Sequence, residues 1–229
     1  MSGRAALVAA MLGLLAPPKA PGRPPRAEET PRRVEPKRMK VTQGAMEPLS
    51  DGRLLIEAPK VRAVLSTPET PRLQAAMLSE RARVAELRFT YLGATRDQVP
   101  LRSGEPRRQV GLKLRAQDGC NVVYVMWRLA PKAGLVVSVK HNPGMHRSDD
   151  CGNGGYATVR PSHKAPVPEL VPGEGHTLRA ELQGAELTVK VDDKPVWEGT
   201  LPSEALTFDG PVGLRTDNGR FQVELLSTP

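Results

Sequence analysis

The sequence predicts an all-β fold, a two-sheet antiparallel sandwich preceded by a disordered N-terminal segment. Beyond residue 50, apolar and polar residues alternate in short runs, as in strands that bury one face. The chain also contains 21 glycines and 23 prolines, which favour frequent turns. Only residues 69–81 have a pattern compatible with a helix, so we expect no helical crossovers between parallel strands.

Residues 1–20 are predicted to be an export signal. One basic residue, Arg4, precedes an uninterrupted apolar run over residues 5–16, and prolines follow it. The run is shorter than the roughly 20 apolar residues that a membrane-spanning helix needs, so we expect no membrane span. An ordinary N-terminal helix is the alternative. The export signal predicts a protein that is secreted or located in the periplasm or cell envelope.

Residues 21–44 are predicted to be a linker rich in proline and arginine. They include few large apolar residues, so they cannot bury enough surface to offset the loss of conformational entropy on folding. Much of the net charge of +8 falls in and around this segment. The remaining domain, residues 45–229, is then nearly neutral, and we expect it not to bind nucleic acid.

The predicted domain is made of strands that alternate between an inward and an outward face. Residues 121–130 differ, because they are apolar on both faces, and they are expected to form a central strand paired with residues 134–141 in a hairpin. The residues expected to point into the core are Ala85, Leu87, Phe89, Tyr91, Val110, Leu112, Leu114, Leu178, Ala180, Leu182, Leu187, Val189 and Val191.

The two cysteines, Cys120 and Cys151, are predicted to form a disulfide, as is usual in an exported chain. They flank the predicted hairpin, and antiparallel pairing brings the two ends of a hairpin to the same side of the sheet. A catalytic role for Cys151 beside His146 is the alternative, and an oxidising compartment with a second cysteine disfavours it.

Three stretches resemble the concanavalin A-like jelly rolls, a superfamily that includes laminin-G-like, glucanase and 3-keto-disaccharide hydrolase-like domains. The stretches are VGLKLRAQDGCNVVYVMW, GHTLRAELQGAELTVKVDDKPVWEGT and GPVGLRTDNGRFQVELLS, at residues 110–127, 175–200 and 210–227. The resemblance covers roughly residues 50–227 and lies at the level of the fold. It implies a jelly-roll sandwich, on which many unrelated functions occur.

The stretch HNPGMHRSDDCGNGGY, residues 141–156, is predicted to be a recognition loop held at its end by the disulfide. Its amide, carboxylate and imidazole groups suit hydrogen bonds to hydroxyls, and a tyrosine ring suits stacking on a sugar. Two aspartates and an asparagine could instead share a Ca²⁺ ion, but that ion usually takes about six to eight oxygen ligands, so we predict no cofactor and no metal. The expected ligand-binding residues are His141, His146, Asp149, Asp150, Asn153 and Tyr156, with Arg115 or Arg128 from a neighbouring strand.

These observations predict a non-catalytic, monomeric carbohydrate-binding domain whose partner is a polysaccharide or oligosaccharide. Retaining glucanases of this fold carry an E-x-D-x-x-E string that places their carboxylates on one face of a strand, and this sequence has none, so we assign no catalytic residue. Two alternatives remain open. One is a glycoside hydrolase or lyase of the 3-keto-disaccharide hydrolase-like type, and the other is a structural or adhesive envelope protein without a small ligand.

Overall fold

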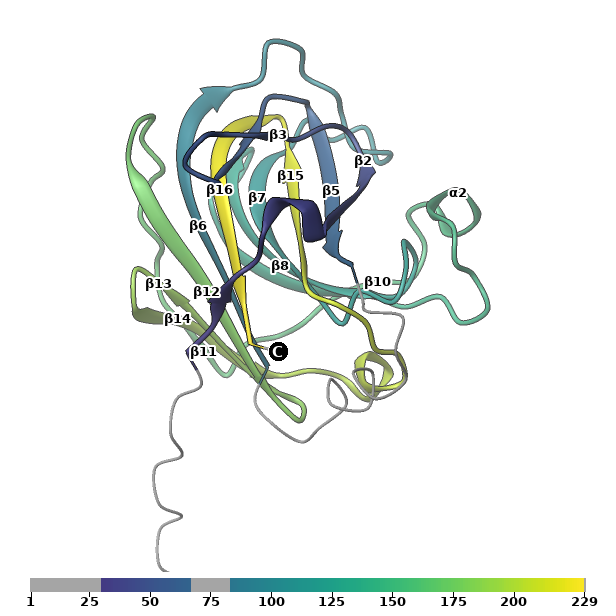
Figure 1. Ribbon diagram of the computed structural model, residues 1–229. Coiled ribbons are helices and arrows are strands. Elements are labelled where there is room, and N and C mark those ends of the chain that lie inside the picture. The colour runs from purple at the N-terminus through teal and green to yellow at the C-terminus, as the bar shows by residue number, and fades with distance from the viewer. Residues whose placement is uncertain (1–29, 67–82, 229) are drawn as a thin grey trace, which may run out of the picture.

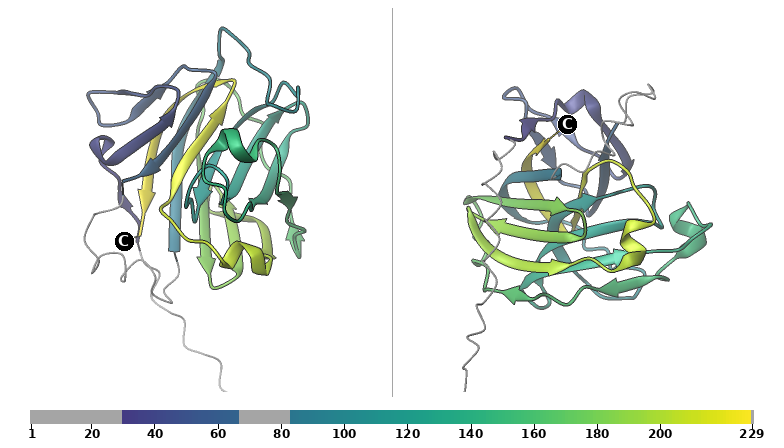
Figure 2. Two further views of the ribbon diagram at one scale, coloured as in Figure 1. Left: turned by 90° about the vertical axis from the view of Figure 1, so that its right-hand side faces the viewer. Right: turned by 90° about the horizontal axis from the view of Figure 1, so that it is seen from below.

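The computed structural model describes residues 30–66 and 83–228, and in that part the chain is an antiparallel β-sandwich. Two sheets lie face to face, as Figure 1 and Figure 2 show, which confirms the predicted fold class. The predicted export signal and the predicted helix at residues 69–81 lie outside the described residues.

The larger sheet has nine strands, in the order β11-β14-β13-β12-β6-β16-β4-β3, with β1 also paired to β16. At its centre, β16 pairs antiparallel with β6 over the whole length of β16. The bounds are β1 (Arg32–Arg33), β3 (Glu47–Pro48), β4 (Leu54–Ile56), β6 (Arg83–Ala94), β11 (His163–Lys164), β12 (Gly175–Gln183), β13 (Glu186–Val191), β14 (Lys194–Thr200) and β16 (Gly219–Ser227).

The smaller sheet has seven strands, in the order β10-β9-β8-β7-β15-β5-β2. The predicted hairpin is present as β8 and β9. The bounds are β2 (Met39–Gln43), β5 (Lys60–Leu65), β7 (Arg108–Leu114), β8 (Val122–Ala130), β9 (Gly134–Lys140), β10 (Tyr156–Thr158) and β15 (Gly213–Asp217). Short helical turns occupy η1 (Pro36–Arg38), α2 (Ser148–Cys151) and η2 (Ser203–Leu206).

The hydrophobic core lies between the sheets, and every residue predicted to point inward is buried there. Both tryptophans belong to this core, where Trp127 packs edge-to-face against Phe89 with 5.6 Å between ring centroids. The strand alternation therefore identified the core correctly, because a half-buried strand presents every second side chain to its partner sheet.

Strand β8 buries both of its faces, as its sequence predicted. Val123, Val125 and Trp127 enter the main core, whereas Tyr124 and Met126 belong to a second, smaller cluster on the opposite face of the sheet. This second cluster lies on the face of the seven-stranded sheet that points away from the main core. The centre of that face is therefore partly apolar.

The predicted linker boundary at residue 44 is wrong for the part that the structure describes. Strand β1 pairs with β16 and strand β2 pairs with β5, so the sandwich includes residues from Arg32 onward. Val34 and Met39 are buried in the core. A strand at the edge of a sheet gains backbone hydrogen bonds from its one neighbour. Two buried apolar side chains are therefore enough to hold this mainly polar segment on the sandwich.

We expect Met39→Ala to lower the free energy of unfolding by about 2 kcal/mol, because it removes a buried side chain from the core. Val41→Ala on the same strand is the matched control, since Val41 is 39 % exposed and its loss should change stability by no more than about 0.5 kcal/mol. Urea denaturation measures both variants. If Met39→Ala is as stable as the unmodified chain, residues 32–43 do not contribute to the core and belong to the linker.

Candidate functional site

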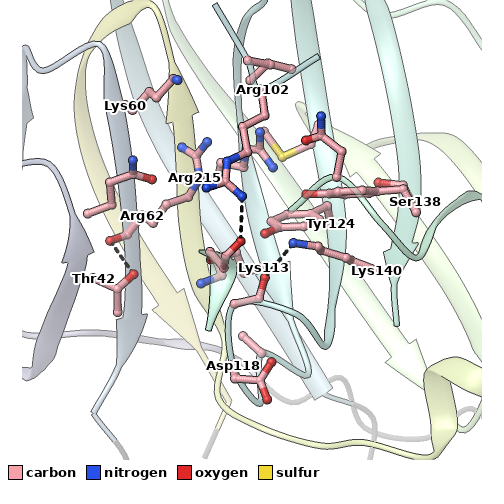
Figure 3. Close-up of a pocket in the computed structure, with 18 of the residues that line it drawn as sticks. Thr42, Lys60, Arg62, Arg102, Lys113, Asp118, Tyr124, Ser138, Lys140 and Arg215 are labelled. Atoms are coloured by element: carbon pink, nitrogen blue, oxygen red, sulfur yellow. Dashed lines mark hydrogen bonds between the residues drawn. The ribbon is translucent and has the colours of Figure 1, made fainter. Parts of the chain in front are cut away.

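A cleft of about 970 Å³ lies on the face of the seven-stranded sheet that points away from the core. Alternation along the strands builds it. In β5 and β7, Arg62 and Lys113 point into the cleft while their neighbours Val61 and Leu112 point into the core. Figure 3 shows side chains from several neighbouring strands meeting in this space.

Among the charged side chains that line the cleft, most are basic. Two aspartates, Asp118 and Asp149, also line it. The nearly neutral net charge predicted for residues 45–229 is compatible with this local cluster, because strands distant in sequence bring their cations together on one face. The nine basic residues are Lys40, Lys60, Arg62, Arg102, Arg107, Lys113, Arg128, Lys140 and Arg215.

The floor of the cleft rests on one buried carboxylate, that of Asp217. It accepts hydrogen bonds from Arg62 Nη2 at 2.6 Å, Arg215 Nε at 2.9 Å and Gln109 Nε2 at 2.6 Å. Burial alone would raise the pKa of Asp217, but the charges of Arg215 and Arg62 outweigh it and lower that pKa, so the carboxylate is ionised. Two guanidinium groups thus share one negative charge.

Lys113 lies on the same floor and is only 5 % exposed. Within the described ranges its ammonium group forms no hydrogen bond and no ion pair. Burial, reinforced by the charges of Arg62 and Arg215, lowers the pKa of Lys113 to about 8, and the charge of Asp118 opposes this shift. The ammonium is therefore mainly charged at neutral pH without a direct partner.

Two tyrosine rings form a platform beside these cations. Tyr124 and Tyr156 stack with 6.2 Å between ring centroids. The guanidinium of Arg215 lies 4.9 Å from the centre of the Tyr124 ring, and Lys140 Nζ lies 5.2 Å from that of Tyr156. Tyr124 is buried, whereas Tyr156 is 44 % exposed, so Tyr156 offers an accessible ring face.

The loop at residues 141–155 forms one wall of the cleft, and the predicted disulfide between Cys120 and Cys151 is present, with 5.9 Å between the Cα atoms. Further bonds hold the loop in place. Asn121 Oδ1 accepts from the Asn142 backbone N–H at 2.9 Å, and Asn121 Nδ2 donates to the carbonyl of Met145 at 3.0 Å.

One glycine fixes the end of this loop. Gly155 has φ of +71°, and a Cβ there would overlap the carbonyl of His141. Glycine adopts this left-handed backbone without steric cost, which explains its place directly before strand β10.

Five of the predicted ligand-binding residues line the cleft: His146, Asp149, Asn153, Tyr156 and Arg128. His146 Nδ1 lies 2.8 Å from Asp118 Oδ2, and Asp149 pairs with Arg102 at 2.8 Å. Both contacts bind the loop to neighbouring turns, so these two side chains shape the cleft wall.

The other three predicted residues do not line the cleft. His141 has the core parity of β9 and stacks on Phe208 with 5.7 Å between ring centroids. Arg115 has a left-handed backbone, with φ of +49°, which breaks the alternation of side chains just after β7. Its guanidinium therefore points away from the cleft and donates a hydrogen bond to the carbonyl of Phe208. Asp150 is exposed on α2.

The sequence interpretation missed the residues at the centre of the cleft: Arg62, Lys113, Tyr124, Lys140 and Arg215. A usable pattern was present, because these residues alternate with core residues on their strands, as in KVRAVL and GLKL. The pattern shows that they share the outward parity. It does not show that β15 inserts between β7 and β5 and so brings them together.

In the part of the chain that the structure describes, no three or more histidine, cysteine, aspartate or glutamate side chains are grouped to hold a metal ion. No helix within the same residues is long and apolar enough to cross a membrane.

No protein-family model matches the sequence, and a search of curated proteins finds no match either. Solved structures do match. The carbohydrate-binding module CBM66 from Bacillus subtilis is 12 % identical, over 81 % of this chain and 91 % of the module, with a TM-score of 0.53. The metal-free carbohydrate recognition domain of Emp46p is 13 % identical, over 83 % of this chain and 88 % of that domain, with a TM-score of 0.51.

The chain shares its fold with these two domains. The jelly-roll sandwich implied by the sequence resemblance is thus supported at the level of the fold. At such low identity the likeness carries no residue roles, and the finer resemblance to laminin-G-like or 3-keto-disaccharide hydrolase-like domains stays a prediction.

Proposed function

We propose that this protein is a non-catalytic carbohydrate-binding domain, secreted or associated with the cell envelope, that binds its glycan in the cleft of the seven-stranded sheet. The observation that carries the proposal is the stacked pair of Tyr124 and Tyr156 beside hydrogen-bonding side chains in that cleft. A sugar ring stacks on an aromatic face, and its hydroxyls pair with the surrounding polar groups.

The size of the cleft and its position in the fold support binding of a short stretch of glycan. A volume of about 970 Å³ lies at the upper end of the range for small-molecule sites, roughly 300 to 1,000 Å³. Ser138 and Gln109 line the cleft beside the cations and supply uncharged polar groups. The two structural neighbours are named for carbohydrate binding.

The carboxylates near the cleft favour binding over hydrolysis. Asp217 is buried under two arginines, Asp149 pairs with Arg102, and Asp118 accepts hydrogen bonds from the turn that carries Cys120. A retaining glycosidase needs two carboxyl groups about 5 to 5.5 Å apart that are free to act as nucleophile and acid. Each of these three carboxylates is instead occupied by cations or backbone groups.

The disulfide supports a location outside the reducing cytosol, because disulfides persist in oxidising compartments. It agrees with the export signal predicted for residues 1–20.

We expect Tyr156→Ala to weaken glycan binding by about 1 to 3 kcal/mol, because it removes the exposed stacking face while leaving the core untouched. Val171→Ala is the control, since Val171 is 47 % exposed and does not line the cleft. A glycan array identifies a ligand for the full chain, and calorimetric titration then compares the variants.

Three results would contradict the proposal. If Tyr156→Ala binds the glycan as tightly as the unmodified protein, the binding site lies outside the cleft. Turnover of an oligosaccharide by the purified protein would make it an enzyme. Absence of binding to every glycan tested would favour a structural or adhesive role.

A further inference from the structure

The floor of the cleft holds more positive charge than its own carboxylate neutralises. Arg62 and Arg215 share Asp217, and Lys113 lies beside them, buried and without a hydrogen bond among the described residues. A buried charge is costly unless it is paired. Cations gathered at one point also repel one another, so the floor of the cleft carries a net positive charge that an anionic ligand would stabilise.

Two further lysines that line the cleft add to the excess of positive charge. Lys60 donates to the carbonyl of Pro100 at 2.7 Å, and Lys140 donates to the carbonyls of Gly119 and Gly152 at 3.1 and 3.0 Å. Carbonyl groups orient an ammonium but do not cancel its charge. Several positive charges inside one cleft add up to a strong positive potential, which raises the local concentration of anions. In Figure 3, Lys140 and Arg215 extend into the same space from different strands.

On the outer face of the nine-stranded sheet, by contrast, cations are paired with carboxylates. Arg179 pairs there with Glu86 at 3.3 Å and with Glu181 at 2.7 Å, and Arg88 pairs with Glu86 at 2.7 Å. Cations on that face alternate with carboxylates, as on an ordinary solvated sheet. The unneutralised charge is therefore a local property of the cleft.

We infer that the glycan is acidic, and that its carboxylate or sulfate group binds on the floor of the cleft between Lys113 and the guanidinium groups of Arg62 and Arg215. This inference rests on the proposed function and specifies its ligand. The two Nη groups of Arg215 can donate parallel hydrogen bonds to a planar anion, and the ammonium of Lys113 adds a point charge. Arg62 contributes through its charge, because its Nη atoms already donate to Asp217 and to two backbone carbonyls. The sugar ring that carries the anion then lies against Tyr156.

A glycan fits this cleft better than nucleic acid does. Duplex DNA is held mainly by basic side chains that reach out to a row of phosphates. Here the central cations are recessed, with Lys113 and Arg215 only 5 % and 8 % exposed. A single anionic group on a sugar can enter far enough to reach them.

The pH dependence of binding follows from Lys113. Its pKa is about 8 in the free protein, so affinity should fall roughly tenfold between about pH 7 and pH 9 as the ammonium loses its proton. The groups facing it are Arg62, Arg215 and Asp118, and Tyr124 lies opposite it on β8. Burial raises the pKa of Tyr124, which keeps that phenol neutral in this range.

The test is a titration of the full chain with four polymers: polygalacturonate, the same polymer with its carboxyls methyl-esterified, heparin, and double-stranded DNA. We expect polygalacturonate or heparin to bind at least tenfold more tightly than the neutral ester, and the better of the two distinguishes carboxylate from sulfate. Lys113→Met should weaken that binding by about tenfold to a hundredfold. Lys113→Arg should keep binding and lose the pH dependence, since arginine stays charged.

Two further variants complete the design. Arg128→Gln removes a cation from the cleft wall and should also weaken binding, which keeps the test valid if Lys113→Met does not fold. Lys194→Gln removes an exposed cation from the far sheet and should leave affinity unchanged. Tighter binding of the neutral ester, weakened by Tyr156→Ala, would overturn the acidic ligand and keep the proposed function. Binding of DNA alone, sensitive to Lys113→Met, would overturn both.

Discussion

Replacement of Asp217 with asparagine should lower the free energy of unfolding by about 3 to 5 kcal/mol. Asp217 is fully buried and is the shared partner of Arg62 and Arg215. Its loss leaves two buried guanidinium groups and the nearby Lys113 without a compensating charge. Removing one partner of a buried ion pair is costly because the remaining charge cannot return to water.

Chemical denaturation at neutral pH measures this loss. Asp51→Asn is the matched control, because Asp51 makes an exposed ion pair with Arg53, worth no more than about 1 kcal/mol. An acidic glycan should recover part of the stability of Asp217→Asn by supplying the missing anion. Stability equal to that of the unmodified protein would show that the arginines do not depend on Asp217.

Replacement of Cys120 and Cys151 together with serine should lower the free energy of unfolding by about 3 to 4 kcal/mol. The disulfide spans 31 positions in the sequence, and closing a loop of that length restricts the unfolded chain by this amount on the chain-entropy model. The sandwich should still form, since its hydrophobic core cluster includes no residue of the loop at residues 141–155.

Denaturation with and without reductant checks this prediction. Reductant should destabilise the unmodified protein and leave the double variant unchanged. The variant should also bind glycan more weakly, because the disulfide holds the wall of the cleft that includes Asn153. A double variant as stable as the oxidised protein would contradict the prediction.

The sequence predicted the fold correctly where a strand buries one complete face. The run from Ala85 to Tyr91 alternates because every second side chain enters the core, and this local property is visible in one dimension. The disulfide followed from the same reasoning, since pairing of β8 with β9 brings Cys120 near Cys151.

The sequence could not predict features that depend on long-range pairing. Residues 32–43 look like a linker, yet they form edge strands because β16 and β5 offer open hydrogen-bonding edges. The cleft is a similar case. Lys113 and Arg215 are about a hundred positions apart, and they meet only because β15 pairs with β7.

The sequence identified only one part of the candidate site, the loop at residues 141–156, in which polar residues are concentrated. Tyr156 and His146 reach the cleft, but they stand at its wall. His141 directly follows Lys140, so its side chain points to the other side of the sheet, away from the cleft, and stacks on Phe208. The charged floor consists of single basic residues on separate strands, and no single stretch of the sequence shows it.

The most direct test of the proposed binding in the cleft is a residue-resolved NMR titration of the full chain with the acidic polymer fragment that binds most tightly. We expect the largest changes in chemical shift at the amides around Lys113, Tyr124 and Arg215, on three neighbouring strands of the seven-stranded sheet. Changes confined to the nine-stranded sheet, with these three amides unmoved at saturation, would contradict binding in the cleft.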